Sequence, residues 1–196
     1  MNQPKTILTG NVNFQRYDSA EAKRIRDTVE RIYVNSYVDA ISSGDPFDTV
    51  SAFMERFDAY TNRSDFDMVV AYTGNMPVGQ TWGWPLDERA GKGWWSGLIG
   101  SPEPDFTQED GHRTFALSEI MVRQEYTGKH IARALHNRLL SNRPEHRATL
   151  LVESNNEPAY RAYLNWGWRK VAQLRPNWPN APLFDVLILK LPISTA

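Results

Sequence analysis

The chain has 196 residues, with 22 basic and 23 acidic side chains, a net charge of -1 and no cysteine. This length suits one domain with a sizeable core, and no stretch in the middle has the composition of a linker. Balanced charge gives no one-signed field for nucleic acid or a membrane surface, so we expect neither as a partner. The lack of cysteine excludes disulfides, thiolate nucleophiles and cysteine-based metal sites. We therefore expect a single domain over residues 1–196.

The opening residues 1–10 contain no apolar core of signal-peptide length, and no apolar run elsewhere approaches the roughly 20 residues that span a bilayer. We expect residues 1–10 to be a flexible tail and the protein to be cytoplasmic.

In the first half, alternation predicts a short strand over residues 12–17, and apolar residues at helical spacing predict a helix over 18–41 that begins at Asp18 or Ser19. A second amphipathic helix is predicted over 49–60. Two strands, 66–73 and 76–86, are joined by Gly74-Asn75, which is typical of a hairpin turn.

The second half opens with a segment rich in Gly, Pro and Trp, residues 87–112, which we expect to be a long loop with a functional or mobile role. Strands are then predicted over 113–122, 148–154, 168–174 and 184–191, with helices over 128–141 and 157–166. Alternating strands and helices favour parallel pairing there, and hairpins at either end make the predicted sheet mixed.

Gly128 lies in a turn between a predicted strand and a predicted helix, and Asn156, Ala159, Tyr163 and Gly167-Trp168 follow the next strand. These two motifs resemble those of the Gcn5-related N-acetyltransferase (GNAT) superfamily. The family marks its acyl-CoA site with Gln or Arg, two residues, Gly, one residue, then Gly or Ala, between a strand and a helix. Gly128 matches the first glycine, whereas Glu125 and His130 depart from the pattern. Downstream, Asn156, Ala159, Tyr163 and Gly167-Trp168 match the second signature.

The resemblance implies an α/β fold with a mixed, mostly antiparallel sheet, a parallel pair at the cofactor site and helices on both faces. It also implies transfer of an acetyl group from acetyl-CoA to a primary amine of a small molecule or peptide by direct attack. The residues expected at the cofactor are Ile120, Met121, Val122, Arg123, Thr127, Gly128, Lys129, His130, Ile131, Ala132, Arg133, Asn156, Ala159 and Tyr163. Backbone N–H groups of residues 120–122 would hold the oxyanion, and those at the glycine turn the pyrophosphate.

Two residues are candidates for proton transfer. Glu119 is a charged residue in an apolar strand, so it is our candidate for the general base. The alternative is a structural carboxylate paired with Arg113 or Arg147. Tyr163 matches the family's general acid, and the alternative is an aromatic ring that packs on the sheet. Asn156 either bonds the pantetheine arm or holds the strand–helix junction.

Four tryptophans, Trp82, Trp84, Trp94 and Trp95, are candidates for the acceptor pocket. For Trp82 and Trp84 we favour the core, because they alternate onto one sheet face. At least one of Trp94 and Trp95 is expected to contact a ligand or partner. Carboxylates of the same segment, Glu88, Asp105, Glu109 and Asp110, would suit a cationic acceptor, although loop carboxylates are usually only solvated.

The four histidines do not form a metal pattern, since His130 and His136 lie six residues apart on one helix, and we expect all four to be surface or helix-turn residues. No metal site is predicted. Two other functions stay open. The first is a non-catalytic acyl-CoA-binding or protein-interaction module on the same fold, which the departures at Glu125 and His130 would allow. The second is a protein that binds a sugar or peptide through its tryptophan-rich loop, without a cofactor. A homodimer is a further expectation from the family.

Overall fold

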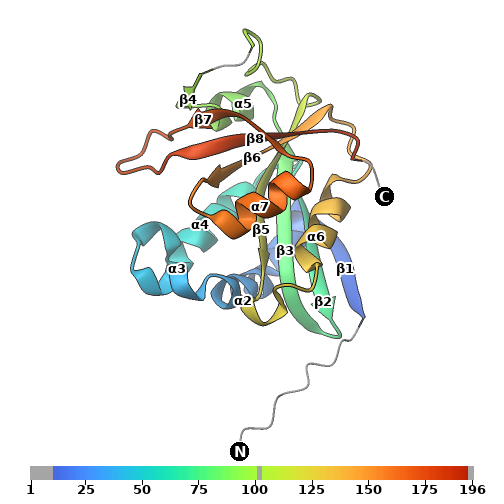
Figure 1. Ribbon diagram of the computed structural model, residues 1–196. Coiled ribbons are helices and arrows are strands. Elements are labelled where there is room, and N and C mark those ends of the chain that lie inside the picture. Colours follow the sequence, from blue (N-terminus) through green and yellow to red (C-terminus); the bar gives the residue numbers. More distant parts are fainter. Residues whose placement is uncertain (1–10, 101–102, 194–196) are drawn as a thin grey trace, which may run out of the picture.

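The computed structural model describes residues 11–100 and 103–193, and the predicted tail over residues 1–10 lies outside this part. One eight-stranded sheet runs through the molecule (Figure 1) in the order β1-β2-β3-β5-β6-β8-β7-β4. Its strands are β1 (Val12–Asp18), β2 (Asp67–Thr73), β3 (Met76–Pro85), β4 (Leu98–Ile99), β5 (Thr114–Val122), β6 (Arg147–Glu153), β7 (Arg169–Leu174) and β8 (Phe184–Lys190). Only β5 and β6 pair in parallel among the described strands. The mixed, mostly antiparallel sheet with one parallel pair is therefore confirmed.

Helices cover both faces of the sheet. They are α1 (Ser19–Arg24), α2 (Arg26–Ser36), α3 (Val38–Ser43), α4 (Val50–Tyr60), α5 (Glu88–Trp94), α6 (Ile131–Leu140) and α7 (Glu157–Asn165), with short 3-10 turns η1 (Pro46–Asp48) and η2 (Gln124–Tyr126). On one face α1, α2 and α4 pack against β2, β3 and β5. On the other face α6 and α7 lie over β3, β5 and β6. The central strands are thus buried between two apolar layers.

The single helix predicted over residues 18–41 is three helices. Asp18 caps the first one as expected, because its side chain accepts from the Glu21 N–H at 2.8 Å while the Glu21 side chain accepts from the Asp18 N–H at 3.0 Å. The helix breaks at Ile25 and again at Tyr37, where φ and ψ leave the helical region. Apolar spacing does not register a break of one residue, so the prediction was wrong on continuity.

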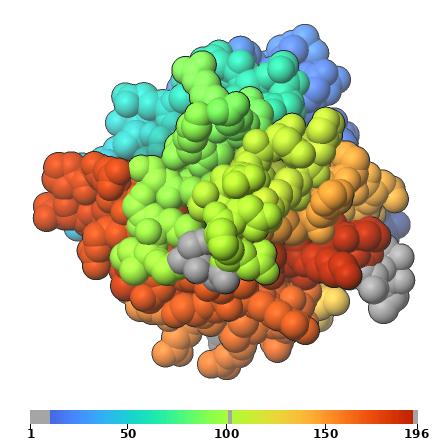
Figure 2. All heavy atoms as spheres, turned by 90° about the horizontal axis from the view of Figure 1, so that it is seen from above, coloured from blue at the N-terminus to red at the C-terminus, as the bar shows by residue number. Residues whose placement is uncertain are grey.

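Residues 87–112 are not one long loop. Asp87 caps α5 by accepting from the Ala90 N–H at 2.6 Å, and β4 pairs with β7. Figure 2 shows this segment, in green to yellow-green, spread over one end of the molecule between the N-terminal helices and the C-terminal strands. Its glycines and prolines suggested irregular backbone, but the capping aspartate was also readable in the sequence.

Candidate active site

The site is built around the place where two neighbouring strands separate. Pairing between β5 and β6 runs only from Thr114–Arg147 to Ala116–Thr149, although β5 continues to Val122 and β6 to Glu153. Beyond Ala116 no other described strand pairs with that edge of β5. An opening between the two strands is the result.

Backbone N–H groups face this opening. The Arg123 N–H donates to the Val78 carbonyl on β3 at 2.9 Å, in the register that places Val122 opposite Gly79. Because N–H directions alternate along a strand, the N–H groups of Ile120 and Val122 point away from β3, toward the opening. The side chain of Met121 is buried, so of this residue only the backbone belongs to the site.

The turn after β5 leaves a second set of N–H groups free. Gly128 and His130 both have positive φ, 74° and 60°, and His130 directly precedes α6. Six consecutive N–H groups, from Gly128 to Arg133, donate to no group in the described part of the chain. They surround the N-terminus of a ten-residue helix, which is the geometry that binds a phosphate.

His130 and Glu125, the two departures from the family pattern, do not close this turn. His130 adopts the left-handed conformation that a glycine would supply, and its side chain is exposed. Glu125 forms an ion pair with Arg123 at 2.7 Å, which neutralises its charge. Of the nearby cations, Lys129 lies over the Tyr126 ring at 4.6 Å, and Arg133 is exposed with no anionic partner among the described residues. Both are available to an anion.

Thr127, Ile131 and Ala132 contribute mainly backbone to the predicted set. The Thr127 hydroxyl donates back to the Gln124 carbonyl at 2.8 Å, and the Ile131 side chain is buried in the core.

On the other side of the opening, Asn156 precedes α7 and its exposed side chain makes no capping hydrogen bond. Ala159 is partly buried on the core side of α7. The junction is held instead by backbone, with the Asn156 N–H donating to the Glu153 carbonyl at 3.0 Å. A structural role for the Asn156 side chain is therefore not supported.

The end of α7 is fixed by an indole and an imidazole. Gly167 has φ of 95°, and the Trp168 Nε1–H donates to Nε2 of His136 at 2.9 Å. His136 is buried, so its prediction as a surface or helix-turn histidine was wrong. Burial lowers the pKa of His136 to about 4, which keeps the ring neutral and able to accept.

Tyr163 lies on the buried face of α7, in T-shaped contact with Trp166 and Trp168. Its hydroxyl makes no hydrogen bond within the described residues. Burial raises the pKa of Tyr163 well above its ordinary value, and the charge of Glu119 raises it further. Tyr163 is thus close enough to Glu119 to sense its charge, and the roles of both residues in proton transfer stay predictions.

Glu119 sits next to an irregularity in β5. The register with β3 shifts between Trp82 and Gly83, so Ser118 is an extra residue directly before Glu119. Arg113 and Arg147 are both occupied by groups of the 103–114 segment, so neither pairs with Glu119. No ion pair neutralises its half-buried carboxylate within the described chain, and burial raises the pKa of Glu119 to about 7.

Four tyrosines sense the charge of Glu119, and three of them come from the N-terminal helices. The Glu119 charge raises the pKa of Tyr33, Tyr37 and Tyr60, after the larger effect of burial on each. Tyr37, at the break between α2 and α3, is also coupled to Tyr163. The sequence prediction missed these residues, because their shared spacing indicated only an apolar helix face.

Two further charges reach Glu119. Arg56 on α4 lowers the pKa of Glu119 and Asp48 raises it, each to a smaller extent than burial does. Arg56 donates to the Phe47 carbonyl at 2.9 Å and lies over the Phe47 ring at 3.8 Å. Both were absent from the predicted site.

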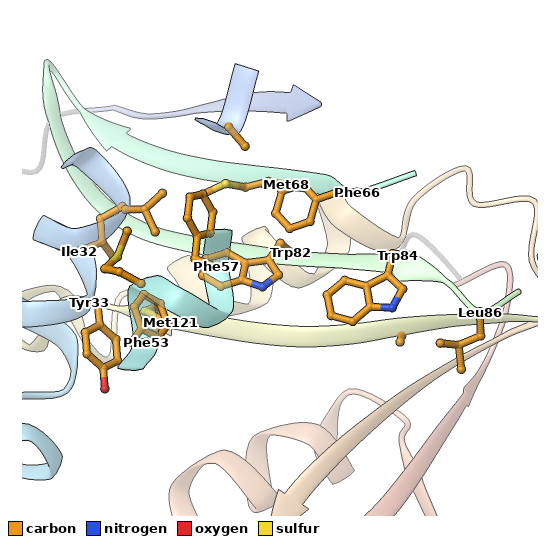
Figure 3. Packing of buried hydrophobic residues seen from close by; sticks show 14 of the residues in the cluster. Ile32, Tyr33, Phe53, Phe57, Phe66, Met68, Trp82, Trp84, Leu86 and Met121 are labelled. Atoms are coloured by element: carbon orange, nitrogen blue, oxygen red, sulfur yellow. The ribbon is translucent and has the colours of Figure 1, made fainter. Parts of the chain in front are cut away.

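The four tryptophans lie in the apolar core rather than along an opening. Figure 3 shows Trp82 and Trp84 pointing from β3 into the cluster that contains Phe53 and Phe57, as expected for core residues. Trp95 is 5% exposed and donates to Glu109 at 3.0 Å, whereas Trp94 is partly buried against Trp84. As acceptor contacts, Trp82, Trp84 and Trp95 offer almost no surface, because packing uses their rings.

The carboxylates of the 87–112 segment also have internal partners. Glu88 pairs with Lys92, Asp105 with Arg113, and the buried Glu109 with Arg147 at 3.2 Å. Asp110 accepts from the N–H groups of His112 and Arg113. Within residues 11–100 and 103–193 no three His, Asp or Glu side chains gather as metal ligands. Nor does any helix there have the length and apolarity to cross a membrane.

Comparison with known proteins agrees with this geometry. The family model described as "Acetyltransferase (GNAT) family" matches residues 28–168, and no functionally curated protein matches the chain in sequence. Among solved structures, an acetyltransferase from Thermus thermophilus is similar at 14% identity and a TM-score of 0.61, covering 92% of this chain and 97% of its own.

Two further similar structures hold acetyl-CoA or coenzyme A. YncA from Salmonella typhimurium, solved with its cofactor acetyl-CoA, has 14% identity and a TM-score of 0.56, covering 95% of this chain and 98% of its own. The PaiA N-acetyltransferase from Thermoplasma acidophilum, in complex with coenzyme A, has 10% identity and a TM-score of 0.51, covering 92% and 99%. At these identities the likeness shows a shared fold.

Proposed function

Because the chain belongs to the GNAT acetyltransferase family, we propose that it transfers an acetyl group from acetyl-CoA to the primary amine of a small molecule or peptide by direct attack. The observation that carries the proposal is the separation of β5 and β6 beyond Ala116, with free backbone N–H groups along that edge of β5. Glu119 and Tyr163, whose pKa values are both raised by burial, are the proposed proton-transfer groups. The cytoplasmic location and the homodimer stay predictions.

The donor would lie across two sets of backbone N–H groups. Those of Gly128 to Arg133, with Lys129 and Arg133 beside them, would hold the pyrophosphate. Gly128 suits a phosphate because a Cβ there would meet nothing within 4 Å, so the surface is open, while its φ of 74° favours glycine. At the reacting end, Ile120 and Val122 would donate to the thioester oxygen as its charge grows.

Glu119 would take the proton from the amine. With its pKa raised to about 7, it is a base matched to neutral pH, strong enough to accept a proton and deprotonated often enough to act. The amine nitrogen forms the new bond to the carbonyl carbon as the bond to sulfur breaks, and Tyr163 would return one proton to the sulfur. One proton leaves nitrogen and one reaches sulfur, so the transfer balances.

The two residues would assist each other. While Glu119 is charged, it raises the pKa of Tyr163 and holds the hydroxyl proton in place. Once Glu119 has taken the amine proton it is neutral, and that part of the effect disappears. Tyr163 then becomes a better proton donor at the moment the sulfur leaves.

Isothermal titration of acetyl-CoA into the protein tests the donor site. We expect one bound molecule per chain, with affinity that falls about tenfold or more in the Lys129→Ala, Arg133→Ala double variant, because each cation makes a charge-assisted contact. Arg138→Ala is the matched control, since Arg138 is exposed on the same helix but lies over Phe14. No binding would reject the proposal, whereas binding without turnover on any amine would favour the non-catalytic acyl-CoA module.

A further inference from the structure

Arg56 lies on α4 with its guanidinium over the Phe47 ring at 3.8 Å. Burial raises the pKa of Tyr60, one helical turn later, and Tyr60 lies near enough to the Ser118 side chain on β5 for that contact to lower this pKa to a smaller extent. Ser118 directly precedes Glu119. Residues four apart lie on one helix face, so Arg56 shares the face of α4 that looks onto this part of β5. Its guanidinium also lies 5.9 Å from the Phe53 ring, and Figure 3 shows Phe53 beside Tyr33 and Met121 of the same strand.

Arg56 has no anionic partner in the described part of the chain. Seven other arginines each form an ion pair with a carboxylate: Arg16, Arg26, Arg63, Arg113, Arg123, Arg143 and Arg147. Arg56 instead has one backbone carbonyl, that of Phe47, and an aromatic ring beneath it. A half-buried guanidinium in this state keeps donors that an incoming anion can use.

Two carboxylates, Glu119 and Asp48, sense the charge of Arg56, and burial and then Asp45 raise the pKa of Asp48. Neither forms an ion pair with Arg56, yet the pKa of each is lowered by its charge, so all three share one region. Around them lie aromatic side chains: Tyr37, Tyr60, and the exposed Phe47, which stacks with Trp178 of the β7–β8 connection at 6.0 Å. Among the described residues, the region thus offers a cation without an ion pair, a carboxylate with a raised pKa and aromatic side chains.

We propose that the acceptor is an amino acid or another amine that carries a carboxylate, with the carboxylate on Arg56 and the amine at Glu119. This inference rests on the proposed function and names its acceptor class. A guanidinium binds a carboxylate through two parallel N–H bonds, and this contact would orient the amine for attack. The aromatic walls suit an apolar side chain, so leucine, methionine and phenylalanine are the first acceptors to test.

The test compares each amino acid with its carboxamide, which removes the negative charge and also makes the amine less basic. We would measure kcat/KM for both by thiol release at pH 9, where Glu119 is deprotonated in every variant that keeps it. For each protein we take the ratio of kcat/KM for the acid to kcat/KM for the amide. The quotient of the wild-type ratio and the Arg56→Gln ratio cancels the intrinsic difference in reactivity between the two amines. We expect this quotient to be about tenfold to a hundredfold, the usual worth of a charge-assisted contact.

Two further variants guard against a purely structural role of Arg56. Arg56→Lys keeps the charge and is expected to retain part of the preference, whereas Arg24→Gln, at an exposed arginine of α1, is expected to leave it unchanged. A quotient near one, with amides acetylated as well as acids, would overturn the inference and leave the acyltransferase proposal intact. No acetylation of any amine would instead overturn the proposed function.

Discussion

The raised pKa of Glu119 makes a prediction that can be worked through. If Glu119 is the base with a pKa of about 7, only about 1% of it is deprotonated at pH 5, so kcat/KM there should be about 100-fold below its high-pH plateau. A carboxyl with the ordinary value of 4.5 would be mostly deprotonated at pH 5, and the rate would fall less than about twofold. Thiol release measured from pH 5 to pH 9, with each rate divided by the deprotonated fraction of the amine at that pH, separates the two cases.

Two substitutions should move the profile in opposite directions. On a plot of kcat/KM against pH, the rise that reports Glu119 should shift to higher pH in Arg56→Gln, because Arg56 lowers the pKa of Glu119. This rising limb should shift to lower pH in Asp48→Asn, because Asp48 raises that pKa. Glu119→Gln should remove the limb together with most of the activity. The ionisation of the amine itself also produces a rising limb, but none of these substitutions would move it. A limb at the same pH in all four proteins would refute the assignment of Glu119.

Three other predictions concern single residues. Tyr163→Phe should lower kcat by about 100-fold or more, with little change in the affinity for acetyl-CoA measured by titration. Tyr37→Phe should lower kcat less than about tenfold. If Tyr37→Phe has the larger effect, the general acid is Tyr37. His136 binds its proton more weakly in the folded chain, at a pKa of about 4 against 6.5, so its contribution to the free energy of unfolding is complete above pH 6.5 and lost as the pH falls to 4. Urea unfolding at pH 7 and pH 4 should show a loss larger by about 3 kcal/mol in wild type than in His136→Gln, and equal losses would contradict the buried neutral imidazole. Finally, Gly83→Ala should destabilise the fold by about 1–3 kcal/mol, because the added Cβ would lie 2.1 Å from the Ala116 carbonyl oxygen. Gly93→Ala, whose Cβ would meet nothing within 4 Å, should be neutral or stabilising. Thermal unfolding that ranks the two variants otherwise would contradict this packing.

What could be predicted from the sequence is what depends on short spacing. The hairpin at Gly74 and the cap at Asp18 are encoded within a few residues, and the structure has both. Gly128 and Tyr163 could be singled out for the same reason, as a turn and a helix face, and their roles stay predictions. The mixed sheet followed from the order of such elements.

What could not be predicted depends on contacts across the fold. Arg56 and Tyr37 lie far from Glu119 along the chain, and only the packing of α2 and α4 on β5 brings them together. Trp95 and His136 were misjudged for the related reason that burial is decided by distant partners, Glu109 for one and Trp168 for the other. Residue type alone does not specify such partners.

The most direct test of the central claim is the release of coenzyme A thiol from acetyl-CoA at pH 8, with and without leucine, methionine and phenylalanine and their amides, by wild type and Glu119→Gln. We predict release that requires an amine and falls at least about 100-fold in the variant, because the opening between β5 and β6 would then lack its base. Release that is equal in the two proteins, or that no amine stimulates although acetyl-CoA binds, would contradict catalysis at this site.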